Sequence, residues 1–312
     1  MAYGIDLLKM KKNSIVLLPE IICDVAVKVF LKRKLKVKFY KLDNYFEPIW
    51  SDINRYNFKN ISAILMIHFF GYPQKYSKFL NLAKKKGIYL IEDNCHSFPI
   101  QYKKRTLGKI GHIGIDSPRK LIDELYSGGR LYINFDLKTP PMKIQNFHVT
   151  KKQIFKNKIK EKFKKFYKLY KFNGNRPKFE YPYLYSDLDN DFSIKLIDKK
   201  SFEKIKNINL HNEYDKRKIV YAKIDKFVKK NNMKSIFKLK KNLIPMYYVA
   251  QTKNFEHSKK IFNWAWNNKV QALSWPSFYK KFKLNKNLYK RWQRYICFPL
   301  NQEISNINEK KI

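Results

Sequence analysis

Cysteine is scarce in this 312-residue chain, and its few copies lie far apart. Cys23, Cys95 and Cys297 are odd in number, and no two of them form a CxxC pair. A disulfide framework or a structural zinc site needs more cysteines at closer spacings. The pattern therefore predicts reduced thiols in a cytoplasmic protein.

Long apolar runs are also lacking. No run approaches the roughly 18 residues that are needed to cross a bilayer. The first residues, MAYGIDLLKMKK, contain no apolar h-region of a signal peptide. The sequence therefore predicts no membrane span and a location in the cytoplasm.

Arginine is rare although the chain is strongly basic. The formal net charge is +42, yet only nine of the 67 basic residues are Arg. Arg is the usual reader of phosphates and base edges. The excess of Lys is spread over the whole length, together with many Asn, Ile, Phe and Tyr residues, as an AT-rich coding sequence would give. Nucleic-acid binding therefore stays only as a remote alternative.

The first 135 residues alternate short apolar runs with helical patterns. Strands are predicted at residues 14–19, 36–42, 63–70, 88–93, 112–116 and 130–135, and helices at 24–34 and 73–87. This order predicts an α/β fold with a mainly parallel sheet flanked by helices. Ligands of such sheets bind at the carboxyl ends of the strands, where Asp93 follows one of them.

The regular alternation ends near residue 136. Residues 136–190 predict an irregular and helical insertion with a basic amphipathic helix at 152–172. That helix could bind RNA or a membrane surface, but its regularly spaced apolar side chains favour packing on the core. A long helix is predicted around 198–231, followed by strands and helices of a smaller C-terminal α/β domain. We expect a large domain over residues 1–200 and a small one over 201–312.

Two short segments carry residues with a defined chemical use. LIEDNCHSF (90–98) ends a predicted strand with Asp93, and DSPRKLIDELYSGG (116–129) places Ser117 and Lys120 after the next strand. A carboxylate can hold a pyridine nitrogen protonated, a lysine can form a Schiff base with an aldehyde, and a hydroxyl can bind a phosphate. These are the groups that pyridoxal phosphate (PLP) requires from a protein.

The chain resembles the DegT/DnrJ/EryC1/StrS aminotransferases, fold-type-I PLP enzymes that aminate keto groups on nucleotide-linked sugars. The resemblance runs through VLLPEIICD, VKFYKLD, IHFFGYPQKYSKFLNLAKKKGIYLIEDNCHSF, LGKIGHIGIDSPRK and GGRLYIN, and it resumes at YDKRKIVYAKI and ICFPLNQ. It implies the aspartate aminotransferase-like fold of PLP-dependent transferases, with a large PLP-binding domain and a smaller C-terminal α/β domain.

Single residues carry over from the motifs of the family. Asp93 matches the aspartate of E-D-x-x-Q, which pairs with the pyridine nitrogen, and His96 stands where a glutamine usually contacts the phenolic oxygen. Ser117 matches the phosphate-binding serine. Lys120 matches the Schiff-base lysine, in a shorter S-x-R-K form of the motif. The resemblance thus implies a cofactor site of Asp93, His96, Ser117 and Lys120, with Lys120 as the catalytic residue.

The resemblance also implies what the site does. Relatives that dehydrate sugars have His in place of the lysine, so Lys120 argues for amino transfer from an amino acid, glutamate, to a nucleotide-linked keto sugar. Such products serve amino-sugar and cell-surface polysaccharide biosynthesis. Gly128 and Gly129 would let the backbone turn beneath the cofactor. The family implies a homodimer that shares an asparagine across its interface, for which Asn190 is a candidate.

Three departures from the family keep a second interpretation open. The segment that family members carry ahead of MAYGIDLL, with the start of the active-site arm, has no counterpart in this sequence. A Gly-Thr or Gly-Arg step that would help to bind the phosphate is not found near Gly4 and Ile5. Neither Ile22 nor Cys23 is aromatic, although a ring in this region often stacks on the cofactor. A catalytically degenerate member of the same fold, acting as a binding partner, therefore remains an alternative.

Overall fold

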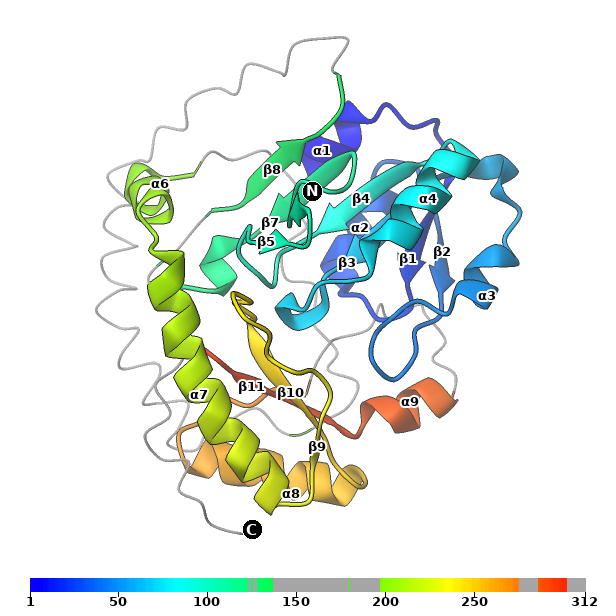
Figure 1. The fold of residues 1–312 in the computed structure, drawn as a ribbon. Coiled ribbons are helices and arrows are strands. Elements are labelled where there is room, and N and C mark those ends of the chain that lie inside the picture. The colour runs from blue at the N-terminus through cyan, green and yellow to red at the C-terminus, as the bar shows by residue number, and fades with distance from the viewer. Residues whose placement is uncertain (123–124, 126–127, 137–178, 180–196, 275–285, 302–312) are drawn as a thin grey trace.

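A six-stranded sheet with the order β2-β1-β3-β4-β7-β8 forms the first half of the protein. The computed structural model describes residues 1–122, 125, 128–136, 179, 197–274 and 286–301 (Figure 1). The strands of the sheet are β1 (Ile15–Pro19), β2 (Lys36–Tyr40), β3 (Ile61–Ile67), β4 (Tyr89–Asp93), β7 (Ile113–Asp116) and β8 (Arg130–Ile133). Every pair is parallel except β7 with β8. The predicted α/β fold with a mainly parallel sheet is confirmed.

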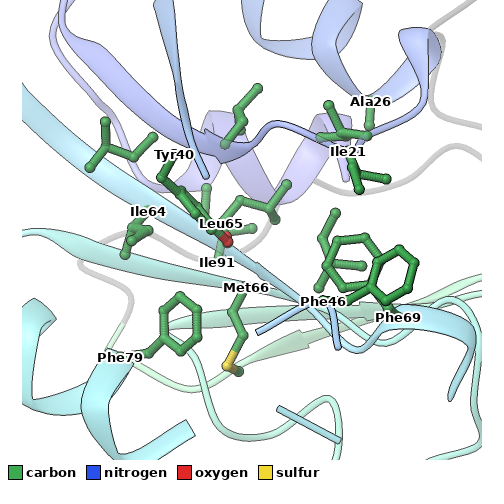
Figure 2. Close-up of a cluster of buried hydrophobic side chains, with 14 of the residues drawn as sticks. Ile21, Ala26, Tyr40, Phe46, Ile64, Leu65, Met66, Phe69, Phe79 and Ile91 are labelled. Carbon is green, nitrogen blue, oxygen red and sulfur yellow. The ribbon is translucent and has the colours of Figure 1, made fainter. Parts of the chain in front are cut away.

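Helices pack on this sheet because each presents an apolar face to it. They are α1 (Ala2–Leu7), α2 (Asp24–Leu31), α3 (Trp50–Asn54) and α4 (Tyr76–Lys86). In Figure 2, Phe79 of α4 lies below the strands and Ala26 of α2 lies above them. Helix α4 ends at Gly87, which adopts the left-handed conformation (φ +62°) that closes many helices. The sheet is therefore covered by helices, as parallel sheets require.

The predicted strand 63–70 is three residues shorter at its end than expected, because β3 stops at Ile67. A short 3₁₀ turn, η2 (Phe69–Gly71), follows it. Within this turn Phe70 has φ +57°, an uncommon value for a bulky residue. Gly71 has φ +93°, and a Cβ there would come within 2.3 Å of the backbone oxygen of His96. The chain therefore turns sharply at the carboxyl edge of the sheet, close to the loop that follows β4.

A second, antiparallel sheet with the order β11-β10-β9 forms the C-terminal half. Its strands are β9 (Lys234–Ser235), β10 (Tyr247–Gln251) and β11 (Tyr295–Pro299), and its helices are α7 (Leu210–Lys230), α8 (Phe255–Asn267) and α9 (Lys286–Trp292). Figure 1 shows this sheet below the first, with α7 along one side and α8 beneath. A hydrophobic cluster of its own includes Ile224, Phe262 and Ile296. A smaller C-terminal α/β unit is present, and the boundary at residue 200 stays a prediction.

The prediction of one long helix at 198–231 is wrong. The structure has two helices, α6 (Lys199–Lys206) and α7, separated by a short break. The side chain of Asn209 accepts hydrogen bonds from the backbone N–H of His211 (3.0 Å) and Asn212 (3.1 Å), which caps the start of α7. The apolar spacing continues across the break and so conceals it. The predicted insertion and its basic helix fall on residues 137–178 and 180–196, outside the described residues.

The smaller elements of the described part are a hairpin and two further 3₁₀ turns. The hairpin pairs β5 (Gln101–Tyr102) with β6 (Arg105–Thr106). The turns are η1 (Phe58–Asn60) and η3 (Pro118–Lys120). Within the described ranges, no helix is both long and apolar enough to span a membrane.

Phe46 joins the two sheets. Its ring lies 5.1 Å from the ring of Phe70 at the end of β3, 6.1 Å from that of Trp292 in α9 and 5.3 Å from that of Tyr295 in β11. Phe46 and Phe69 are labelled side by side in Figure 2. A single hydrophobic core accordingly contains residues of both sheets.

Candidate functional site

The carboxyl ends of β4 and β7 lie next to each other in the parallel sheet. Asp93, the last residue of β4, is in register with Ile67 of β3 and Ile115 of β7. Lys120 ends the η3 turn that follows β7. Asp93 and Lys120 are close enough to interact electrostatically, as are Lys120 and the thiols of Cys23 and Cys95. The structure therefore brings the predicted carboxylate and the predicted lysine into one crevice.

Lys120 is half-buried in this crevice. Burial disfavours its ammonium form, but the acidic side chains of Cys95, Cys23 and Asp93 outweigh that effect and raise the pKa of Lys120. Without a reaction partner the side chain is therefore an ammonium ion at neutral pH. It has to lose a proton before it can attack an aldehyde.

Asp93 is held in place from both sides. Its Oδ1 accepts a hydrogen bond of 2.9 Å from the backbone N–H of Cys95. Its backbone oxygen accepts one of 3.0 Å from the N–H of His68, at the end of β3. This Asx-type contact after a strand fixes the carboxylate at the mouth of the crevice.

His96 is buried and keeps a defined orientation. Its Nδ1 accepts a hydrogen bond of 3.3 Å from the backbone N–H of Phe70, and the two rings stack with centroids 6.4 Å apart. Burial, and then the charge of Lys120, hold the pKa of His96 well below its usual range. The ring is therefore neutral at pH 7, and because Nδ1 is the acceptor, the hydrogen sits on Nε2. His96 can donate this hydrogen to an oxygen atom.

Ser117 and Lys120 share the η3 turn. The backbone oxygen of Ser117 accepts a hydrogen bond of 2.9 Å from the N–H of Lys120. The Ser117 hydroxyl makes no capping hydrogen bond to the turn.

Of the two predicted glycines, Gly128 has a backbone conformation that favours glycine. It has φ +123°, and a Cβ at this position would come within 2.9 Å of Ile197 and Ile205. Gly128 thus lets the segment after Lys120 pass close to α6. Asn190, the candidate for the residue shared between subunits, lies outside the described residues.

Glu92 is an important residue that the sequence interpretation missed. It is fully buried, and its carboxylate accepts hydrogen bonds from the backbone N–H of Gly108 and Ile110 (both 2.6 Å) and of Gly111 (3.1 Å). His68 Nε2 lies 2.9 Å from its Oε1. Burial disfavours the charged form of Glu92. The contact with His68 and the hydrogen bonds from these N–H groups have the larger effect, so the pKa of Glu92 is lowered. An acidic residue inside the apolar strand IYLIED is the signal that could have revealed it.

Arg217, in α7 of the second half of the chain, contacts the segments that carry Lys120 and His96. It is buried, and its Nη2 donates a hydrogen bond of 2.7 Å to the backbone oxygen of Leu121, next to Lys120. Its guanidinium lies over the ring of Phe98, 5.6 Å from the centroid, and Nη1 is bonded to Glu213. Arg217 therefore ties the lysine turn to the loop that holds His96.

Replacing Arg217 with Met is expected to lower the free energy of unfolding by about 2–3 kcal/mol, because a buried hydrogen bond to a charged donor is lost. Urea denaturation at neutral pH would measure it. Lys218→Met, at the exposed neighbouring position, is the control and should change stability by no more than about 0.5 kcal/mol. Equal effects of the two substitutions would contradict the role of Arg217.

The crevice offers a lysine amine, a carboxylate, a neutral imidazole donor and a serine within one edge of the sheet. This set suits an aldehyde-bearing, phosphorylated pyridine better than it suits a metal ion. No group of three or more His, Cys, Asp or Glu residues that could hold a metal occurs in the part of the chain that the structure describes.

Comparison with known proteins agrees with this chemistry. The sequence pattern of the DegT/DnrJ/EryC1/StrS aminotransferase family matches residues 7–168. A GDP-perosamine synthase of Escherichia coli O157:H7 is 32% identical over 63 residues, which are 20% of this chain and 17% of that protein. Through this match the chain spans less than a fifth of the length of that curated relative.

Solved structures share the fold over nearly the whole chain. PseC of Helicobacter pylori, an aminotransferase involved in the biosynthesis of pseudoaminic acid, matches with a TM-score of 0.63 and 13% identity, over 98% of this chain and 82% of its own. The GDP-4-keto-6-deoxy-D-mannose-3-dehydratase of E. coli with bound hydrated PLP matches with a TM-score of 0.57 and 14% identity, over 96% and 81%. The predicted fold of PLP-dependent transferases is thereby confirmed. With half of its length matched by the family pattern, the chain belongs to the DegT/DnrJ/EryC1/StrS aminotransferase family.

Proposed function

We propose that this protein is a PLP-dependent aminotransferase that moves an amino group from an amino acid, glutamate, to a keto sugar that is linked to a nucleotide. The single observation that carries the proposal is the meeting of Lys120 and Asp93 at the carboxyl edge of adjacent strands, beside a neutral His96. Two matched proteins support the choice of acceptor: PseC, an aminotransferase involved in the biosynthesis of pseudoaminic acid, and the GDP-perosamine synthase.

The residues present fit the cofactor by their chemistry. Lys120 would hold the aldehyde carbon and Asp93 the protonated pyridine nitrogen. His96 would donate its Nε2 hydrogen to the phenolic oxygen, because its Nδ1 is already engaged by Phe70. Ser117 would bind the phosphate through its hydroxyl, which the η3 turn does not use as a cap. When bound, PLP supplies an electron sink that stabilises a carbanion at the amino-acid Cα.

Lys120 has two tasks in the proposed reaction. It would hold the cofactor, and its amine, once free, would remove the proton from the Cα of the amino acid. The Asp93 carboxylate would stabilise the positive charge of the pyridine ring. His96, neutral and buried, keeps water out and fixes the orientation of the ring without adding charge.

Covalent labelling of Lys120 tests cofactor binding without an activity assay. One equivalent of PLP is added to the purified protein, the adduct is reduced with borohydride, and peptides are analysed by mass spectrometry. We expect the label on the peptide that contains Lys120, because the surrounding groups of the crevice favour PLP there over solvated lysines.

The large excess of lysine makes a matched control necessary. Lys104→Arg removes an exposed lysine of the β5–β6 hairpin and should leave the labelling unchanged. Lys120→Arg should remove the label from this peptide. Label spread over surface lysines in the unaltered protein would contradict the proposed site.

We also propose that the protein is a homodimer and that Asn190 is the residue shared between its subunits. The same proposal includes a large domain over residues 1–200 and a small one over 201–312. A degenerate, non-catalytic member of the family is the second candidate, and the departure at Cys23 supports it. Cys23 lies beside Lys120, where relatives often place a ring that stacks on the cofactor. A chain that is labelled at Lys120 but converts no amino acid would support this second candidate.

A further inference from the structure

A cavity of about 690 Å³ lies apart from the Lys120 crevice, between the two sheets. One wall comes from the segments that follow β1 and β2, and the other from the end of β10, the start of α8, and α9. None of Asp93, His96, Ser117 and Lys120 lines it. Its volume is in the range of pockets that enclose a ligand of nucleotide size.

The lining of this cavity is strongly cationic. Glu20 is its only carboxylate among the described residues. The cations that line it come from both walls: Lys41, Lys253, Lys290, Arg291 and Arg294. After the charge of Glu20 is subtracted, the lining carries a surplus of four positive charges. Such a lining favours an anion that carries more than one charge.

Arg291 supplies a fixed positive charge in one wall of the cavity. Its Nη1 donates to the backbone oxygen of Leu42 (2.7 Å), and its Nη2 lies 3.3 Å from Oε1 of Glu20. Glu20 also accepts from the N–H of Leu42 at 3.0 Å, so the guanidinium is held rigidly. Yet Arg291 Nε is buried and has no hydrogen-bond partner in the described part of the chain. Because this Nε is buried, Arg291 attracts an anion in the cavity by its charge and not through a hydrogen bond from Nε.

The remaining lining suits an organic group attached to the anion. Side-chain amides, which can both donate and accept hydrogen bonds, are contributed by Asn44, Gln251, Asn254, Asn287 and Gln293. Ile49, Leu288 and the ring of Phe255 provide apolar surface. Amides with an aromatic ring are the contacts that hydroxyl groups and a base require.

We propose that this cavity binds a nucleoside diphosphate as a second site, separate from the crevice and independent of the proposed amino transfer. The diphosphate lies among the lysines, beside the positive charge of Arg291, and the nucleoside contacts the amides and Phe255. Because the lining comes from both sheets, the ligand holds their facing edges together.

Isothermal titration calorimetry of the full chain with ADP tests the proposal. We expect saturable binding to one site, and Lys253→Gln combined with Lys290→Gln should weaken it at least about tenfold, since each lysine offers a charge-assisted hydrogen bond. Both positions are exposed, so the double variant keeps the fold. Lys84→Gln combined with Lys85→Gln, on α4, removes the same charge far from the cavity in the fold and should leave the affinity unchanged.

Four results would overturn the proposal. No binding of ADP at millimolar concentration excludes the site, and equal weakening by the two double variants shows only unspecific attraction to a basic protein. Pyrophosphate that binds as tightly as ADP excludes a nucleoside contact. ADP affinity that persists in Lys120→Ala supports a second site, whereas its loss assigns ADP to the crevice.

Discussion

Replacing Lys120 with Ala is expected to lower kcat for amino transfer by about 10²- to 10⁴-fold, the usual contribution of a positioned proton carrier. The structure places the amine of Lys120 beside Asp93 and His96. The half-reaction with glutamate is the simplest measurement, because release of 2-oxoglutarate in a single turnover needs no knowledge of the sugar.

One control variant and one rescue experiment make this result specific. Lys104→Ala, at an exposed position of the β5–β6 hairpin, should retain full activity. Added methylamine should restore part of the activity of Lys120→Ala, because a small amine can enter the space of the side chain and carry the proton. A Lys120→Ala protein within tenfold of the unaltered protein would show that another group moves the proton.

Replacing Glu92 with Gln is expected to lower the free energy of unfolding by about 3 kcal/mol at pH 7, because the buried donors that the carboxylate accepts from would be left without a full set of acceptors. The carboxylate binds His68 and the N–H groups of the turn at 108–111, which an amide cannot all serve. Urea denaturation measures the change. Glu203→Gln, on the exposed face of α6, should change stability by no more than about 0.5 kcal/mol.

The effect of Glu92→Gln should also depend on pH. The pKa of Glu92 in the folded protein is lowered from 4.5, so the unfolded chain binds its proton first as the pH falls. The stability that the carboxylate contributes is complete above pH 4.5 and is lost as the pH falls through the folded-state pKa. The difference between the two proteins should therefore shrink below pH 4.5. A difference that stays constant from pH 7 down to acid unfolding would contradict this role of Glu92.

The parallel sheet and its crevice could be predicted because their signals are local. Buried strands such as β1 and β4 are unbroken apolar runs, and the end of each strand is near a change to polar residues. Asp93, Ser117 and Lys120 lie at the carboxyl ends of adjacent strands, so their meeting follows from the fold once the strands are known.

What the sequence could not reveal depends on contacts between distant residues or on backbone angles. Arg217 reaches Leu121 across 96 residues, and Arg291 reaches Leu42 across 249. Neither arginine belongs to a motif that names its partner. The turn at Phe70 was hidden for another reason: apolar residues continue through it, and hydrophobic periodicity does not report a positive φ.

Phe46 has a consequence for how the protein unfolds. Its ring contacts Phe70 of the first half as well as Trp292 and Tyr295 of the second. Opening either sheet would expose the aromatic core of the other. The two sheets therefore form a single cooperative unit, and a change of architecture near residue 200 would not mark an independently stable fragment.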